Sequence, residues 1–302
     1  MQLGFVSAIL PDLSLDELFA FAREEGFDCI ELMCWPVGAA DRRYAGVTHL
    51  DVANLNDGTV SRVHGLVETT GVRISGLGYY PNPLAPDAEH RQMVGQHLMK
   101  VMDAAKALGI GVVNTFIGRD PSRSIEDQWP LFREVWSPLV AHAEKRGVKI
   151  GIENCPMLFS RDEWPGGKNL AIAPEIWRKM FQEFPGHALG LNFDPSHLVW
   201  QFIDIPRAVR EFGPRIYHVH AKDARVDADR LHDRGILGLD WHTPKLPGMG
   251  DVNWNAFFST LTDTGYNGPV CIEVEDRAYE GPLENRKRSL RQSRNFLRQW
   301  VV

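Results

Sequence analysis

The stretch Leu189-Gly-Leu-Asn-Phe-Asp-Pro-Ser-His197 is a short apolar run that ends abruptly in a carboxylate, a proline and a histidine. Leu189, Leu191 and Phe193 alternate with small or polar residues, a pattern that favours a β-strand of an α/β protein. Such a strand delivers Asp194 at its carboxyl end, where α/β folds place their chemistry. Three other short runs end in the same way, in Glu153, His220 and Glu273.

Strand and helix signals alternate from one end of the chain to the other. Besides the opening stretch, seven runs are predicted to be strands: Leu3–Ser7, Phe27–Met33, Val72–Leu77, Val112–Ile117, Val148–Glu153, Ile216–His220 and Val270–Val274. Helices are predicted at Leu15–Glu25, Gly58–Thr70, Ala88–Leu108, Ser124–Arg146, Pro174–Phe184, Ile205–Phe212, Trp254–Thr264 and Leu283–Trp300. Eight strand–helix units in this length predict a closed (β/α)8 TIM barrel, one α/β domain covering residues 1–302.

Three features refine this prediction. The rival architecture, an open doubly wound sheet, lacks its Gly-x-Gly-x-x-Gly turn after the first strand, and no Walker-type phosphate loop is present. Pro130 and Pro138 are expected to break or kink the helix Ser124–Arg146. The segment Ala221–Asp251 has no clear periodicity, so we expect a long functional loop there.

Bulk composition narrows the class of protein. Hydrophobic content of 44% and charged content of 24% are ordinary for a soluble globular protein. The net charge of −6 argues against a nucleic-acid-binding surface, which is usually basic. No segment approaches the roughly 20 apolar residues that span a bilayer, and the first residues do not resemble a secretory signal. The four cysteines form no Cys-x-x-Cys pair. We therefore expect a cytoplasmic protein without nucleic-acid or membrane partners.

The four strand ends are expected to meet. Neighbouring strands lie about 4.8 Å apart, so Glu153, Asp194, His220 and Glu273 can converge on one point. Three carboxylates that close repel one another unless a cation or protons compensate. With an imidazole they form an oxygen- and nitrogen-only set that suits one divalent cation, Mn²⁺ first and Mg²⁺, Co²⁺ or Zn²⁺ as alternatives. Singly, each group has a milder explanation as a loop cap or surface ion pair.

These residues also carry a family likeness. Glu153-Asn, Asp194-Pro-Ser-His197, His220-Ala-Lys-Asp223 and Ile272-Glu273, in this order, resemble the sugar phosphate isomerase/epimerase superfamily of xylose isomerase-like TIM barrels. The resemblance implies that Glu153, Asp194, His220 and Glu273 bind the metal, and that the two glutamates exchange the substrate proton. It also implies that His197 contacts a substrate oxygen and that Arg225 grips substrate. The epimerases of this superfamily carry a further glutamate where this chain has Phe159, which puts the epimerase substrate contacts in doubt.

Other residues have competing interpretations. Glu31 is expected either to bind substrate or to hold a loop amide, and His242 is available to the site from the long segment. Lys222 and Asp223 are expected either to form a plain salt bridge or to hold His220 or the following loop in place. His218 is expected to be a hydrogen-bonded core histidine. Three histidines on predicted helices are expected to face solvent: His64, His90 and His97. Five aromatic residues hint at a substrate larger than a triose: Trp35, Tyr79, Tyr80, Trp164 and Trp241.

Four functions remain open at this stage. The first is a metal-dependent isomerase or epimerase that abstracts a proton next to the carbonyl of a keto-sugar. The alternative is a lyase or dehydratase that eliminates across a keto-sugar, including keto-glycoside or C-glycoside cleavage. An endonuclease IV-like nuclease and a metal-free sugar-binding barrel are more distant. The expected partners are a small carbohydrate substrate and further copies of the chain, with an accessory subunit if the likeness extends to the deglycosidases.

Overall fold

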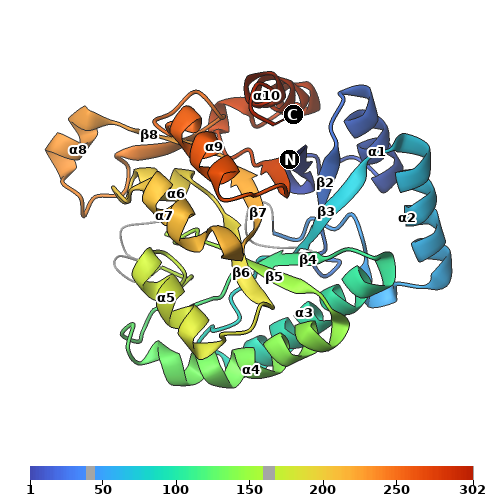
Figure 1. The fold of residues 1–302 in the computed structure, drawn as a ribbon, viewed down its shortest axis with the longest axis horizontal. Helices are drawn as coiled ribbons and strands as arrows, with labels where there is room; N and C mark the ends of the chain where they lie inside the picture. The colour runs from blue at the N-terminus through green and yellow to red at the C-terminus, as the bar shows by residue number, and fades with distance from the viewer. Residues whose placement is uncertain (39–44, 159–166, 302) are drawn as a thin grey trace.

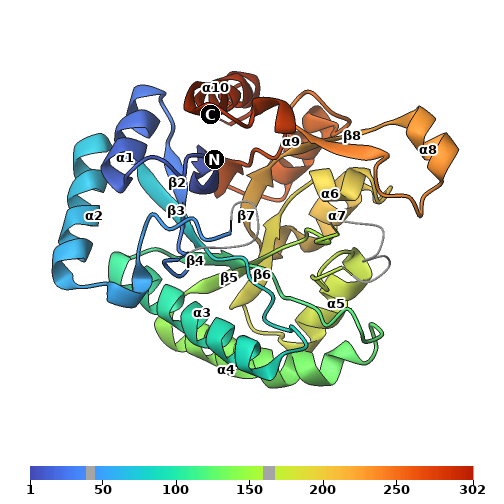
Figure 2. The same cartoon turned by 180° about the vertical axis from the view of Figure 1, so that it is seen from behind.

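Eight parallel strands close into a barrel in the computed structural model, which describes residues 1–38, 45–158 and 167–301. The order around the barrel is β1-β10-β7-β6-β5-β4-β3-β2 (Figures 1 and 2). The strands are β1 (Gln2–Val6), β2 (Cys29–Met33), β3 (Arg73–Gly78), β4 (Val112–Thr115), β5 (Lys149–Glu153), β6 (Leu189–Phe193), β7 (Ile216–Ala221) and β10 (Pro269–Ile272). The predicted (β/α)8 TIM barrel is confirmed.

Helices surround the barrel and connect successive strands (Figure 1). They are α1 (Leu15–Glu24), α2 (Asp57–Thr70), α3 (Ala88–Leu108), α4 (Gln128–Arg146), α5 (Pro174–Glu183), α6 (Ser196–Val199), α7 (Ile205–Phe212), α9 (Trp254–Asp263) and α10 (Leu283–Leu297). Short 3₁₀ turns occupy Ser7–Ile9, Val52–Asn54, Gly213–Arg215 and Arg277–Tyr279. None of these described helices is long and apolar enough to cross a membrane.

Local sequence signals explain where the helices begin and end. Ser14 and Glu17 form a capping box at the start of α1, in which the hydroxyl accepts from Glu17 N and the carboxylate accepts from Ser14 N. Gly109 and Gly147 end α3 and α4 in the left-handed conformation, which glycine adopts without a Cβ clash. Each signal was visible in the sequence because caps depend on neighbouring residues.

The predicted break in the helix before β5 is wrong. Helix α4 runs continuously through Pro138. Pro130 lies in the first turn, where its missing N–H has no intrahelical partner to lose. Pro138 has no N–H for the carbonyl of Glu134 one turn earlier, and the helix continues past this one missing hydrogen bond.

The expected structureless loop after β7 is also wrong. Residues 223–245 form an arm made of β8 (Asp223–Val226), α8 (Ala228–Arg234) and β9 (His242–Lys245), and it projects from the barrel in Figure 1. Strands β8 and β9 pair antiparallel. The buried Asp223 carboxylate fixes the base of the arm by accepting hydrogen bonds from Gly248 N (3.0 Å), Val252 N (3.0 Å) and Trp254 Nε1 (2.8 Å).

The inside of the barrel is polar. His218 of β7 contacts Ser75 of β3 (3.1 Å between Nε2 and Oγ), and these strands are not neighbours, so the contact crosses the interior. Barrel interiors normally hold branched apolar side chains. Gly151 makes room for this polar filling, because a Cβ there would lie 2.4 Å from Asn114 Oδ1. Burying polar side chains costs desolvation free energy, and clusters of buried titratable groups are found most often at functional sites. The polar interior therefore indicates a functional site.

Candidate metal centre and active site

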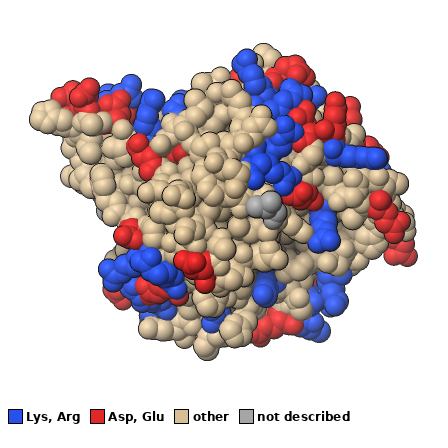
Figure 3. All heavy atoms as spheres, turned by 45° about the horizontal axis from the view of Figure 1, so that its top comes forward, with Lys and Arg blue, Asp and Glu red and all other residues tan. Residues whose placement is uncertain are grey.

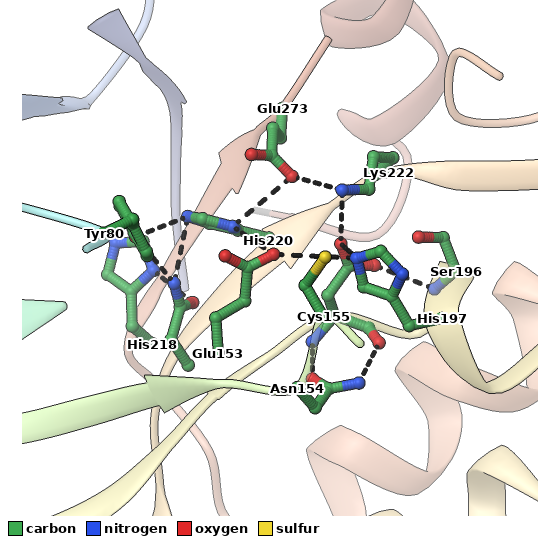
Figure 4. Close-up of polar contacts among 12 residues, drawn as sticks. Tyr80, Glu153, Asn154, Cys155, Ser196, His197, His218, His220, Lys222 and Glu273 are labelled. Carbon is green, nitrogen blue, oxygen red and sulfur yellow. Dashed lines mark hydrogen bonds and ion pairs between the residues drawn. The ribbon is translucent and has the colours of Figure 1, made fainter. Parts of the chain in front are cut away.

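Four side chains converge at the carboxyl end of the barrel. Glu153 ends β5, Asp194 follows β6, His220 lies near the end of β7, and Glu273 follows β10. One ligand atom from each lies within 4.8 Å of the others. His220 Nδ1 is 3.6 Å from Glu153 Oε1 and 3.6 Å from Glu273 Oε2. The sequence prediction that these four groups meet therefore agrees with the geometry, which Figure 4 shows for three of them by label.

Asp194 is held by backbone and amide contacts that leave one oxygen available. Its N–H donates to Asn154 Oδ1 (2.8 Å), and Asn154 Nδ2 donates back to Asp194 O (2.9 Å). Asp194 Oδ1 accepts from Ser196 N at 2.8 Å. Oδ2 is buried and faces the Lys222 ammonium at 3.1 Å. The residue pair Glu153-Asn154 thus places one candidate ligand and also the amide that orients the next one.

A hydrogen-bonded network sets the orientation of the His220 ring (Figure 4). His220 Nε2 lies 2.7 Å from Glu31 Oε2, and Glu31 Oε1 accepts the Tyr80 hydroxyl proton. Asn192 Nδ2 donates to Tyr80 Oη (3.1 Å), while Asn192 Oδ1 accepts from His218 Nδ1 (2.9 Å). Because an ionised carboxylate can only accept a hydrogen bond, Nε2 of His220 carries a proton and donates the hydrogen bond to Glu31. The remaining nitrogen, Nδ1, faces the carboxylates without a hydrogen-bond partner among the described residues.

Lys222 is a member of the site that sequence reasoning missed. Its ammonium lies 2.6 Å from Glu273 Oε2, a contact drawn in Figure 4. It also lies 3.1 Å from Asp194 Oδ2 and 2.8 Å from Glu275 Oε2. The expected Lys222–Asp223 pair is wrong, because successive side chains of an extended chain point to opposite sides. Burial lowers the pKa of Lys222, but the carboxylates of Asp194, Glu273 and Glu275 outweigh it and hold that pKa well above its usual value.

The electrostatics of the centre suit a cation. Burial raises the pKa of Glu153 and of Glu273, but nearby positive groups, His220 and Lys222 among them, outweigh it and hold both at about 2. Burial raises the pKa of Asp194. Burial lowers the pKa of His220, yet the carboxylates of Glu31, Glu273 and Glu153 hold it well above its usual value. Protons and one ammonium therefore offset the clustered negative charge when no cation does so.

The donor set passes a direct test for a divalent cation. His220 Nδ1 is a buried polar atom without a hydrogen-bond partner among the described residues, and Asp194 Oδ2 is neutralised only by the Lys222 ammonium at 3.1 Å. Such orphaned atoms are rare, and a metal ion is one of the few explanations for them. Three carboxylates and one imidazole are ligands that divalent ions such as Mn²⁺ and Zn²⁺ accept. The residues present fit a metal ion.

A cavity of about 880 Å³ opens onto this centre. Glu153, His197, Lys222 and Glu273 line its inner end. Aromatic side chains form part of the wall, at Trp35, Tyr80, Phe116 and Trp200. Cationic side chains line it further out, at Arg230, Arg234, Lys245 and Arg277.

Two predicted substrate-binding residues line this cavity. His197 Nε2 lies 3.4 Å from Asp194 Oδ2 and 3.7 Å from Glu153 Oε1. His242 stacks on Trp200 with ring centroids 4.3 Å apart and an interplanar angle of 2°. Burial, with the charge of His197, lowers the pKa of His242 to about 4.

The other two predicted contacts lie elsewhere. Arg225 is exposed on β8 and is not one of the residues that line the cavity, whereas its neighbour Ala224 is. The structure therefore does not bring Arg225 to the site, and its grip on substrate stays a prediction. Glu31 binds His220 and Tyr80 and does not line the cavity, which favours the structural one of its two interpretations.

The structure also tests the predictions for two histidines outside the four-residue cluster. His218 is a hydrogen-bonded core histidine as predicted, whereas His97 is buried and its Nε2 lies 2.8 Å from Cys34 O. The prediction that His97 faces solvent is therefore wrong. Phe159 and Trp164 lie outside the described residues.

Comparisons with known proteins place the chain in a family. An uncharacterised protein of Bacillus subtilis strain 168, YfiH, is 27% identical over 91% of this chain and 93% of its own length. An inosose dehydratase of Clostridium perfringens is 28% identical, but over only 53% of this chain and 52% of its own. The IOLI protein, solved with a bound zinc atom, superposes with a TM-score of 0.72 at 18% identity, covering 99% of each chain.

The chain also matches a family as a whole. Residues 19–300 match the family described as "Xylose isomerase-like TIM barrel". That range contains all four converging side chains and all strands but the first. Because the match covers far more than half of the sequence, this protein belongs to the xylose isomerase-like TIM barrel family.

Proposed function

We propose that the protein is a metal-dependent isomerase or epimerase that moves a proton next to the carbonyl of a keto-sugar. The observation that carries this proposal is the pairing of two glutamates, the buried Glu153 and the half-buried Glu273, around a shared cation site. Glu153, Asp194, His220 and Glu273 would hold one divalent cation, with Mn²⁺ as the first candidate. When bound, that cation supplies Lewis-acid stabilisation of the negative charge that develops on the carbonyl oxygen.

The two glutamates are the proton carriers. Their lowered pKa values keep both ionised at neutral pH, as a general base requires. Strands β5 and β10 lie on either side of the pair β6 and β7, so the two carboxylates approach the cavity from different sides. Removal of a proton by one and return by the other inverts a carbon centre, whereas removal and return by one group on adjacent carbons interconverts an aldose and a ketose.

The cavity supports a carbohydrate substrate. The stacked pair Trp200 and His242, together with Trp35 and Phe116, offers apolar faces on which sugar rings pack well. Lys222 carries a charge at the inner end and can donate to a substrate oxygen. Assembly into a homo-oligomer, with or without an accessory subunit, stays a prediction.

A dehydratase or other lyase is the second candidate. The inosose dehydratase similarity favours it, and so does the position of Lys222 beside Glu273. After one carboxylate removes the proton, the ammonium can protonate a hydroxyl that leaves from the adjacent carbon, so that water is lost. Proton abstraction is common to both candidates, and they differ only in the fate of the carbanion that it leaves.

Incubation in D₂O separates these candidates. The purified protein, loaded with Mn²⁺, is incubated with a panel of keto-sugars and keto-inositols, and the products are identified by NMR and mass spectrometry. Deuterium in an intact sugar supports the isomerase or epimerase, and an unsaturated or dehydrated product supports the dehydratase. Neither outcome on any substrate, from protein with bound metal, would count against proton abstraction altogether.

A matched pair of variants assigns the activity to this site. Glu273→Gln keeps the shape of the side chain but removes its basicity, so turnover should fall by at least about 10²-fold. Glu68→Gln, an exposed position on α2, should leave the activity unchanged. Full activity in Glu273→Gln would refute the role given to Glu273.

A further inference from the structure

A second cluster of metal-binding side chains borders the first. Glu153, Cys155 and His197 each place a ligand atom within 4.8 Å of the other two. All three residues line the cavity. Figure 4 shows the Cys155 sulfur and the His197 ring on the side of Glu153 away from Tyr80. The cluster shares Glu153 with the four-residue centre and adds two side chains that the proton-transfer mechanism does not require.

His197 points an unsatisfied nitrogen into this cluster. The residue is only 7% exposed, and Nε2 has no hydrogen-bond partner among the described residues. Its distances to Glu153 Oε1 and Asp194 Oδ2, 3.7 and 3.4 Å, exceed those of a normal N–H···O hydrogen bond. A buried imidazole nitrogen that faces two carboxylates without bonding either one needs another partner.

The spacing of the donors suits a metal ion better than a hydrogen bond. Zinc binds nitrogen and oxygen at about 2.0–2.2 Å and thiolate at about 2.3 Å, so two ligands of a tetrahedral ion lie roughly 3.3–3.8 Å apart. The 3.7 Å between His197 Nε2 and Glu153 Oε1 falls in that range. The 3.6 Å between His220 Nδ1 and the same oxygen falls there too, so Glu153 Oε1 faces both clusters.

Charge balance points the same way. Glu153, Asp194, Glu273 and Glu275 supply four negative charges around Lys222, whose ammonium touches three of them. One divalent cation and Lys222 still leave the group negative. Glu31, which pairs with His220, adds a fifth carboxylate to this cluster. A second divalent cation, with Cys155 as its thiolate ligand, brings five positive charges against six negative ones, so it moves the buried cluster closer to neutrality.

We propose that Glu153, Cys155 and His197 form a second divalent-cation site, bridged to the first by Glu153 and selective for a thiophilic ion such as Zn²⁺. Binding releases the thiol proton of Cys155 to solvent. The fourth position of this ion faces the cavity and takes water or a substrate oxygen. His197 then acts on substrate through the cation rather than by direct contact. This inference rests on the proposed function, because the two sites share Glu153.

Cobalt titration tests the second site without relying on activity. Metal-free protein is titrated anaerobically with Co²⁺, while bound metal is counted by mass spectrometry of metals and absorption is recorded. We expect two Co²⁺ per chain, with a thiolate-to-cobalt charge-transfer band in the near ultraviolet. Cys155→Ser should abolish the band and bind one Co²⁺. Cys34→Ala, which removes a buried thiol outside both clusters, should keep the band and both ions.

The remaining outcomes are distinguishable. His197→Ala provides a second variant, which should also lose one Co²⁺ and the band. One Co²⁺ per chain without a charge-transfer band in the unmodified protein overturns the second site and leaves the proposed function standing. A band that persists in Cys155→Ser overturns it as well. Failure to bind any Co²⁺ overturns both the second site and the metal-dependent function.

Discussion

The hydrogen bond between Glu31 and His220 decides which imidazole nitrogen faces the carboxylates. Glu31 Oε2 accepts from Nε2 at 2.7 Å, inside a barrel where both side chains are fully buried. A carboxylate that holds the outer nitrogen of a ligand histidine fixes its tautomer and raises its basicity toward the metal. We therefore expect Glu31 to act on a bound cation through His220, as a positioning residue.

Replacing Glu31 tests this effect. Glu31→Gln can still accept the hydrogen bond but carries no charge, so the affinity for Mn²⁺ should fall by about 10- to 100-fold. Calorimetric titration of the metal-free protein with Mn²⁺ measures the change. Glu68→Gln on the surface of α2 is the control and should bind as the unmodified protein does. Equal affinities in all three proteins would contradict the positioning role.

His242 links stability to pH. Burial, with the charge of His197, lowers its pKa to about 4 from an ordinary 6.5. Between those values the unfolded chain binds a proton that the folded chain does not, so stability falls as the pH drops from about 6.5 to 4 and then levels off. The contribution is up to about 3 kcal/mol. His242→Phe keeps a ring against Trp200 and should remove this part of the pH dependence.

Urea unfolding at several pH values measures that contribution. The difference in unfolding free energy between the unmodified protein and His242→Phe should change only across the window from pH 6.5 to 4. His90→Gln, at an exposed position on α3, provides the control. Parallel pH profiles for all three proteins would show that His242 titrates normally.

Single residues differ in how far sequence predicts their roles. The four converging ligands were predictable, because parallel strands of a closed barrel present their carboxyl ends at one rim. The partners of Glu31 and Lys222 were not, because they depend on which side chains cross the interior. Arg225 was chosen as the first arginine after His220, but the strand β8, which sequence did not predict, turns Ala224 to the cavity and Arg225 to solvent.

At the scale of elements, the arm of residues 223–245 depends on contacts distant in sequence. Its ladder is four residue pairs long, and His242 in β9 stacks on Trp200, which comes directly after α6. Such short strands carry little local signal, so the sequence predicted a loop. The helices α1, α3 and α4 were predicted because their caps and glycine stops lie within a few residues.

The base of the arm should be its weakest point. Asp223→Ala removes the acceptor for four groups, Ala224 N, Gly248 N, Val252 N and Trp254 Nε1, and leaves the buried donors among them unsatisfied. We expect a loss of about 3 kcal/mol in unfolding free energy. Urea unfolding measures it, and Asp229→Ala on the exposed side of α8 should cost less than about 0.5 kcal/mol. Similar stabilities of the two variants would contradict this account of the arm.

At the scale of the whole molecule, ion pairs connect the end of the chain to its start. Helix α10 contacts β1 and β10, and its arginines pair with acidic residues near the start of the chain. The pairs are Arg286–Asp12, Arg291–Glu25, Arg294–Glu25 and Arg298–Asp28. Figure 3 shows Lys and Arg side chains beside Asp and Glu side chains on one face of the molecule.

The metal centre should affect the stability of the entire fold. Its four ligands come from β5, β6, β7 and β10, or from the residue after them, so a cation that they share joins half of the barrel. A ligand that binds only the folded state adds about 2.7 kcal/mol when its concentration is 100 times its Kd. In a chain of this length that corresponds to a rise in melting temperature of about 5 °C.

Calorimetric scans of the metal-free protein with and without Mn²⁺ check this rise. Asp194→Asn removes a ligand charge, so Mn²⁺ should raise its melting temperature far less. EDTA should reverse the rise in the unmodified protein. The direction of the pH effect depends on His220: its raised pKa means that a proton competes with the cation, so the stabilisation by Mn²⁺ should grow from pH 6 to pH 8. If Mn²⁺ leaves the melting temperature unchanged at every pH, the four side chains do not bind the metal ion, and protons and the Lys222 ammonium alone balance their charge.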